Sequence, residues 1–200
     1  MNMQAIKKLT ARDYLTIERQ AEVKSEYFNG ELFAMAGASR KHNQITSNLV
    51  RCLGNQLQDK PCSVYSADMK VKIDYLDKYT YPDVVLSCDN EIFEDEYEDV
   101  LLTPLVIIEV LSDSTEAYDR GDKFLHYQNI ESLKEYILIS QKEYLLEHYI
   151  RKSKNQWIYQ EYHSSENKIY CKSIDSYISL HDVYSKVFMS KKTWNQNTQN

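Results

Sequence analysis

Apolar residues recur at every fourth position in residues 41–58, which predicts a helix with one hydrophobic side. This stripe consists of Ile45, Leu49, Leu53 and Leu57. Ser39 is placed to cap the start of the helix. A capping-box-like pattern from Thr10 to Asp13 predicts a helix at 11–20. Cap residues at the start of 112–130 predict another helix there.

Shorter apolar segments predict strands. Asn29-Gly30 lies between two apolar-rich arms and predicts a β-hairpin, since a type I′ turn needs positive φ at both central residues. Alternation within 62–76 predicts one or two strands. The remaining predicted strands are 81–89, 105–111, 134–140, 144–150 and 157–162, with 169–180 as a further candidate.

Strands interleaved with helices and followed by a run of strands predict an α/β fold with a mixed β-sheet flanked by helices. Two hundred residues fit one domain, which we expect to span residues 1–190. Residues 191–200 are polar and are expected to be a frayed tail.

Glu109 interrupts the most apolar segment of the chain, 105–111. Strands buried on both faces have such continuous apolar runs, so either orientation would bury this carboxylate. A buried Glu needs a partner, because an isolated charge in a core is very costly. Glu109 is therefore either a metal ligand or catalytic acid, or an edge-strand residue that reaches solvent.

Composition narrows the setting of the protein. The net charge is −6, and six of the carboxylates lie in residues 91–99, which we expect to be a solvated loop. The rest of the chain has equal numbers of acidic and basic residues, so no strongly basic surface is indicated. No two of the four cysteines form a CxxC pair, which argues against a zinc ribbon. With no secretory signal or apolar membrane segment, we expect a cytoplasmic protein with reduced thiols.

Asp83 follows Pro82 at the start of the strand that precedes the Glu109 strand. If the two strands pair, the two carboxylates can share one face, and a divalent cation would relieve their repulsion. Lys123 follows on the next predicted helix. It could act on a water or a phosphate at such a site, or it could be an exposed lysine paired with Asp119 at i−4.

The segments "YPDVVLSCD" and "PLVIIEVLSDSTEAYDRGDKFLHYQNIESLKEYILIS", with "EYFNGELFAM" and "SRKHNQI" upstream, resemble the Uma-type (Uma-two) branch of the PD-(D/E)XK restriction-endonuclease-like superfamily. The resemblance covers roughly residues 10–160, with the segments in family order. It implies a restriction-endonuclease-like fold and a metal-dependent endonuclease that hydrolyses phosphodiester bonds in nucleic acid, with DNA as the expected substrate. Mg²⁺ or Mn²⁺ would be the cofactor.

The resemblance also implies roles for individual residues. Asp83 and Glu109 would bind the metal ion. The usual lysine position, two residues after the second acid, is Leu111 here, and the following helix would supply Lys123 instead. Glu31 and His42 match further polar positions of the branch, and Asp68 is a weaker candidate. His42 could equally be an exposed residue in the first turn of its helix. The alternatives for the other two are an ordinary hairpin-arm residue for Glu31 and the end of a strand for Asp68.

Two other functions remain open from sequence. A nuclease fold can serve as a binding or assembly module with little catalysis, and the balanced charge outside the acidic run is compatible with that. The second alternative function is a metal-dependent hydrolase that acts on a small phosphorylated substrate. The sequence also leaves open whether the protein forms a homo-oligomer. The remaining histidines have no ligand-like spacing, and we interpret them as structural or exposed: His126, His148, His163 and His181.

Overall fold

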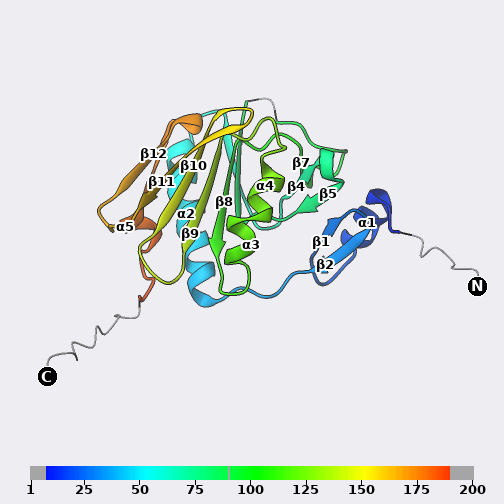
Figure 1. The fold of residues 1–200 in the computed structure, drawn as a ribbon, viewed down its shortest axis with the longest axis horizontal. Coiled ribbons are helices and arrows are strands. Elements are labelled where there is room, and N and C mark those ends of the chain that lie inside the picture. The colour runs from blue at the N-terminus through cyan, green and yellow to red at the C-terminus, as the bar shows by residue number, and fades with distance from the viewer. Residues whose placement is uncertain (1–7, 90, 190–200) are drawn as a thin grey trace, which may run out of the picture.

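The computed structural model describes residues 8–89 and 91–189, and the predicted tail after residue 190 lies outside this part (Figure 1). The helices are α1 (Ala11–Glu18), α2 (Arg40–Leu57), η1 (Asp74–Leu76), α3 (Glu116–Arg120), α4 (Asp122–Tyr127), η2 (Lys172–Ile174) and α5 (Leu180–Val183). The first strands are β1 (Ser25–Phe28), β2 (Glu31–Ala34), β3 (Cys62–Ser66), β4 (Lys70–Ile73), β5 (Lys78–Thr80), β6 (Val84–Cys88) and β7 (Val100–Leu101). The later strands are β8 (Val106–Leu111), β9 (Glu135–Ser140), β10 (Leu146–Ser153), β11 (Gln156–Tyr162), β12 (Lys168–Cys171) and β13 (Ser176–Ser179).

A six-stranded mixed sheet in the order β11-β10-β9-β8-β6-β3 forms the centre of the fold. Only β8 and β9 pair in parallel within it, and α3 and α4 lie in the crossover between them. The other neighbours are antiparallel. The predicted fold class, a mixed sheet flanked by helices, is therefore confirmed.

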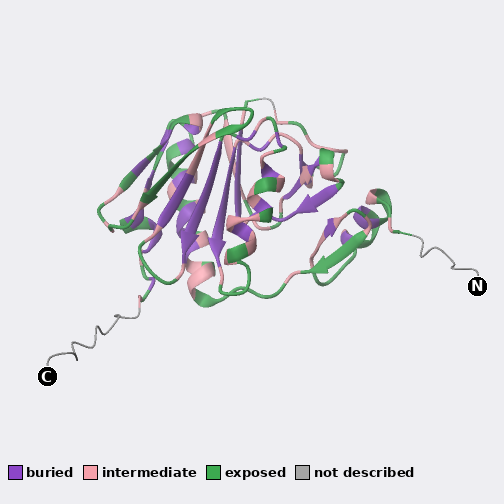
Figure 2. Ribbon diagram, in the orientation of Figure 1, coloured by how far each residue is buried: buried purple, intermediate pink, exposed green. Residues whose placement is uncertain are grey.

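The two faces of this sheet bury different clusters. One face packs against α2, α5 and the β12–β13 hairpin, and includes Val106, Ile108 and Val110 of β8. The other packs against α4 and β4, and includes Ile107 and Leu111. Figure 1 shows these layers on either side of the sheet, and Figure 2 shows that its central strands are almost entirely buried. Because side chains alternate along a strand, Glu109 belongs to the α4 face.

A second, five-stranded sheet in the order β2-β1-β5-β4-β7 carries α1 at the N-terminal end of the chain. Its small core groups the rings of Tyr14, Tyr27 and Tyr79, whose centroids lie 5.1–5.9 Å apart. Their hydroxyl groups donate to polar atoms, for example Tyr14 to the Ser25 carbonyl at 2.7 Å. Tyrosine suits this thin layer because its ring packs while its hydroxyl group keeps a partner.

The hairpin predicted at Asn29-Gly30 is confirmed as β1 and β2. Asn29 has φ 46° and Gly30 has φ 92°, the positive values that a type I′ turn requires. The predicted helix at 41–58 is confirmed as α2, and the Ser39 hydroxyl accepts the His42 amide at 3.1 Å as its cap.

The single helix predicted over 112–130 is wrong, because the segment forms two short helices that meet at Gly121. Gly121 has φ −104° and ψ −103°, which lies outside the helical region. The break turns α4 so that Lys123 and Tyr127 are buried on the sheet.

The acidic run at 91–99 is not the freely solvated loop that we expected. Arg19 at the end of α1 binds Asp95 at 2.8 Å and Asp99 at 2.7 Å, and Lys70 binds Asp99 at 2.9 Å. Burial favours a higher pKa for Asp99, but the two cations outweigh burial and lower its pKa to about 2. The acidic segment therefore joins α1 to β4.

The expectation of four reduced thiols is also wrong. Cys62 on β3 and Cys88 on β6 are directly opposite each other and form a disulfide. Cys52 and Cys171 are free thiols. None of the described helices is long and apolar enough to cross a membrane.

Candidate active site

The strands that carry the two predicted acids are neighbours. In the antiparallel β6–β8 pair, Val84 is opposite Ile108, so Asp83, one residue before β6, comes opposite Glu109. The Val110 amide donates to Asp83 Oδ2 at 2.7 Å, which fixes the carboxylate at this edge. The strand pairing that the sequence interpretation required is therefore present.

His42 contacts Asp83 directly. It lies in the first turn of α2, and its Nε2 atom is 3.0 Å from Asp83 Oδ2. Both side chains are mostly buried at this contact. The Ser39 cap sets where α2 begins, and therefore where the imidazole lies.

Glu109 is only 3% exposed, and its partner is Lys123, which is 8% exposed. Lys123 Nζ lies 2.8 Å from Glu109 Oε1 and 3.5 Å from Asp119 Oδ1. The Tyr127 hydroxyl also donates to Glu109 Oε1 at 2.9 Å. The alternative that Lys123 is exposed is therefore wrong, although the predicted ion pair between Lys123 and Asp119 is present. The buried Glu109 has the partner that its position demanded.

Lys123 and the carboxyl groups around it shift one another's pKa values. Burial raises the pKa of Glu109 to about 8, Asp83 and Asp119 add to the rise, and Lys123 opposes it. Burial disfavours the Lys123 ammonium, but Glu109, Glu26 and Asp119 outweigh burial and hold its pKa well above the ordinary value. More carboxylate than cationic charge is gathered here, and a further cation would relieve the excess.

Asp83, Glu109, His42 and Lys123 all line one open cleft of about 1130 Å³. Its lining also includes basic side chains, residues 112–115 and the aromatic residue Tyr118. The basic side chains besides Lys123 are Lys24, Arg40, Lys41 and Lys142.

Glu31 and Asp68 are not brought into this group. Glu31 is exposed beside the hairpin turn, opposite Phe28. The side chain of Asp68 is 87% exposed and pairs with Lys24 at 2.6 Å. The hairpin instead contributes Glu26 to the cleft.

From the sequence alone, Glu26 was not identified as a residue of the cleft, and Asp119 was considered only as an ion-pair partner of Lys123. Glu26 Oε1 accepts the Tyr81 amide at 3.1 Å and a hydrogen bond from the Thr80 hydroxyl, which ties β1 to the chain just before Asp83. Nothing in the local pattern separates Glu26 from Glu31. The i−4 spacing from Lys123 was the one signal for Asp119.

The residues present fit a hard divalent cation. Mg²⁺ and Mn²⁺ take oxygen ligands, and Asp83 and Glu109 offer carboxylate oxygens in a cleft open to solvent. Burial is the main cause of the raised pKa of Glu109, and the nearby carboxylates of Asp83 and Asp119 raise it further, a contribution that a bound cation would oppose.

Comparison with known proteins gives consistent matches. A model of the Uma2 family, described as putative restriction endonucleases, matches residues 11–176. The uncharacterized Synechocystis proteins sll1609 and slr1290 are 39% and 33% identical to this chain, over 153 and 177 residues. These alignments cover 76% and 88% of this chain, and 86% and 92% of the relatives.

A solved structure shares the fold. It is a putative nuclease belonging to DUF820 from Anabaena variabilis, with a TM-score of 0.73 at 19% sequence identity. The match covers 90% of this chain and 99% of that chain.

Proposed function

Because this chain belongs to the Uma2 family of putative restriction endonucleases, we propose that it is a metal-dependent endonuclease that hydrolyses phosphodiester bonds in nucleic acid. The family and the fold support a nuclease role. Metal dependence, DNA as substrate and catalysis by the cleft residues are parts of the proposal.

One observation carries it: two acids on paired strands and a buried lysine meet in a single cleft. Asp83 and Glu109 would hold Mg²⁺ or Mn²⁺, which when bound supplies an acidified water and neutralises charge on the phosphate. Lys123 is anchored by Glu109 and Asp119, so its ammonium is fixed where it can orient water or stabilise negative charge.

His42 and the basic lining residues complete the proposal. His42 Nε2 and the Val110 amide of β8 both contact Asp83 Oδ2, so this carboxylate is held by two groups. Lys24, Arg40, Lys41 and Lys142 give the cleft cations that can contact a phosphate backbone. The lining also includes acids such as Glu22, Glu26 and Asp113, so these cations are interleaved with carboxylates rather than forming a uniformly basic surface.

The test is nicking of supercoiled plasmid by the purified protein with Mg²⁺ or Mn²⁺. We expect EDTA to stop it, and Asp83→Asn to reduce it by at least 100-fold while lowering Mn²⁺ binding in calorimetry. Asp59→Asn, an exposed acid outside the cleft lining, is the matched control and should behave as wild type. Equal Mn²⁺ binding by wild type and Asp83→Asn would remove Asp83 from the site.

A wild type that binds DNA but does not nick it under any of these conditions would contradict the proposal. That result would favour the alternative of a nuclease fold used as a binding or assembly module.

A further inference from the structure

A second polar cluster lies on the opposite face of the six-stranded sheet from the cleft. Glu135 is the first residue of β9 and alternates with Ile137 and Ile139, which pack on the α2 face. His148 on β10 is directly opposite Ile137 and therefore points to the same side. Cys171 ends β12 and packs in the same hydrophobic cluster.

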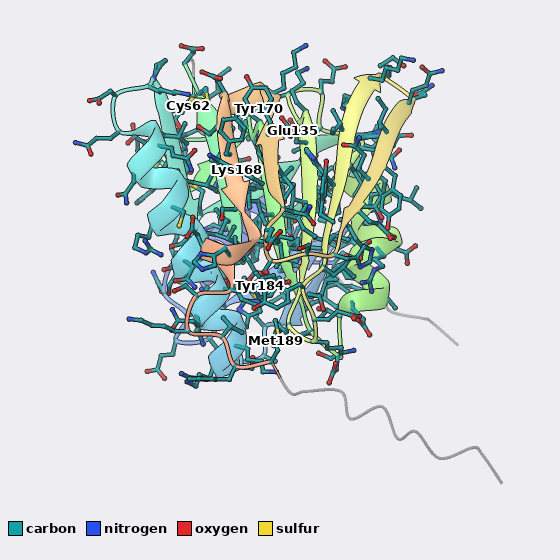
Figure 3. The ribbon with its side chains drawn as sticks, turned by 90° about the vertical axis from the view of Figure 1, so that its left-hand side faces the viewer. Cys62, Glu135, Lys168, Tyr170, Tyr184 and Met189 are labelled. Atoms are coloured by element: carbon teal, nitrogen blue, oxygen red, sulfur yellow. A yellow bond between two sulfur atoms is a disulfide. The ribbon has the colours of Figure 1, made fainter. Side chains whose placement is uncertain are left out.

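The three side chains converge although they come from distant positions in the chain. One potential ligand atom from each, a carboxylate oxygen, an imidazole nitrogen and the thiol sulfur, lies within 4.8 Å of the other two. His148 Nε2 is 2.6 Å from Glu135 Oε2. Figure 3 views the molecule from the side of the β12–β13 hairpin and shows Glu135 at the same end of the molecule as Tyr170, the neighbour of Cys171.

Burial makes this cluster unusual. Glu135 and His148 are each 1% exposed, and Cys171 is fully buried. His148 Nδ1 is buried without a hydrogen-bond partner among the described residues. The neighbouring Ser173 amide and hydroxyl donate to Glu135 Oε1 at 2.8 and 2.5 Å. Three ionisable groups and a hydroxyl group thus share a dry site, where unpaired polar atoms are costly.

We propose that Glu135, His148 and Cys171 form a structural Zn²⁺ site. Thiolate, imidazole and carboxylate are the three ligand types that zinc takes, and the thiolate disfavours Mg²⁺ and Ca²⁺. A closed, solvent-free position is typical of structural rather than catalytic zinc.

The Cys171 thiol must lose its proton to bind the ion. Burial raises the pKa of the Cys171 thiol, and the adjacent Glu135 carboxylate raises it further. The thiol therefore keeps its proton while no metal is bound, and metal binding releases that proton. The bound ion would join β9 and β10 to the β12–β13 hairpin, which pairs with no strand of the main sheet.

Co²⁺ is the probe, because a Co²⁺–thiolate bond gives a charge-transfer absorption band that oxygen and nitrogen ligands do not. The experiment uses the full chain under non-reducing conditions, which keep Cys62 and Cys88 in their disulfide. The two free cysteines then serve as a matched pair: Cys171→Ser removes the proposed ligand, and Cys52→Ser, on α2, is the control.

We expect one thiolate-bound Co²⁺ per chain in wild type and in Cys52→Ser, displaced by Zn²⁺ but not by excess Mg²⁺. The thiolate band should be absent in Cys171→Ser, and Zn²⁺ should raise the melting temperature of wild type by more than that of this variant, because the cleft can bind a divalent ion in both. No thiolate band in wild type would overturn the proposal, as would its loss in Cys52→Ser. These two results need no folded Cys171→Ser protein.

Discussion

Replacing Lys123 by methionine tests how the buried charges at the cleft are balanced. At 2.8 Å from Glu109 the ammonium contributes an attraction of about 6 kcal/mol at an effective dielectric constant of about 20. Desolvation of both groups offsets much of this attraction. Removing only the lysine leaves Glu109 and Asp119 buried without it, and breaking a buried pair in this way typically costs about 3–5 kcal/mol. We therefore expect Lys123→Met to lower the free energy of unfolding by about 3–5 kcal/mol near pH 8.5.

The cost should depend on pH in a defined direction. Without the lysine, the pKa values of Glu109 and Asp119 rise in the folded state, which then binds more protons than the unfolded chain. Stability must fall as pH rises wherever that holds. Lys123→Met should therefore be closer to wild type at pH 5.5 than at pH 8.5. Adding Glu109→Gln to Lys123→Met should restore part of the lost stability, because it removes one of the two buried carboxylates that no longer have the lysine as a partner.

Urea unfolding of wild type, the two single variants and the double variant at both pH values measures these terms. The reasoning is refuted if Lys123→Met costs less than about 1 kcal/mol at pH 8.5, or if the two substitutions are additive at both pH values.

Three further outcomes are expected from other parts of the fold. Opening the Cys62–Cys88 disulfide by a double substitution to alanine should cost about 3 kcal/mol in urea unfolding, because the bond spans 26 residues; an unchanged midpoint would contradict a stabilising bond. Asp99→Asn should be less stable than wild type above about pH 5, and its stability should approach that of wild type toward pH 2. The Arg19 contact helps lower the pKa of Asp99 to about 2, and the stabilisation it gives is lost as the carboxylate is protonated. An equal difference in stability at pH 7 and pH 2.5 would contradict this prediction. Gly30→Ala should cost about 1 kcal/mol or more in thermal unfolding, since φ is 92° there; a neutral effect would mean that the turn adapts.

The sequence was informative wherever one local pattern determined the outcome. The spacing of Ile45, Leu49, Leu53 and Leu57 predicted α2 because a helix buries one side, and Asn29-Gly30 predicted the hairpin because few residues tolerate positive φ. Glu109 stood out because its neighbours on both sides are apolar. In each case the signal lies within a few residues of the feature.

Features that depend on which strands become neighbours could not be predicted from local sequence patterns. Cys62 and Cys88 are 26 residues apart, and only the β3–β6 register brings them together. The position of Glu26 in the cleft depends on how β1 meets the chain before Asp83, and Arg19 reaches the acidic segment only after folding. The burial of Lys123 follows from the break at Gly121, where a continuous helical pattern hid a change of direction.

The opposite placement of Glu109 and Glu135 limits how this sequence can change over evolutionary time. Because side chains alternate along β8 and β9, inserting or deleting one residue within either strand would move its carboxylate to the other face of the sheet. Substitutions there can be accommodated one at a time, but a length change would displace a whole site in one step. The turn between β10 and β11 lies outside these two strands and could lengthen without that penalty. Relatives should therefore differ in length there, while keeping β8 and β9 free of gaps.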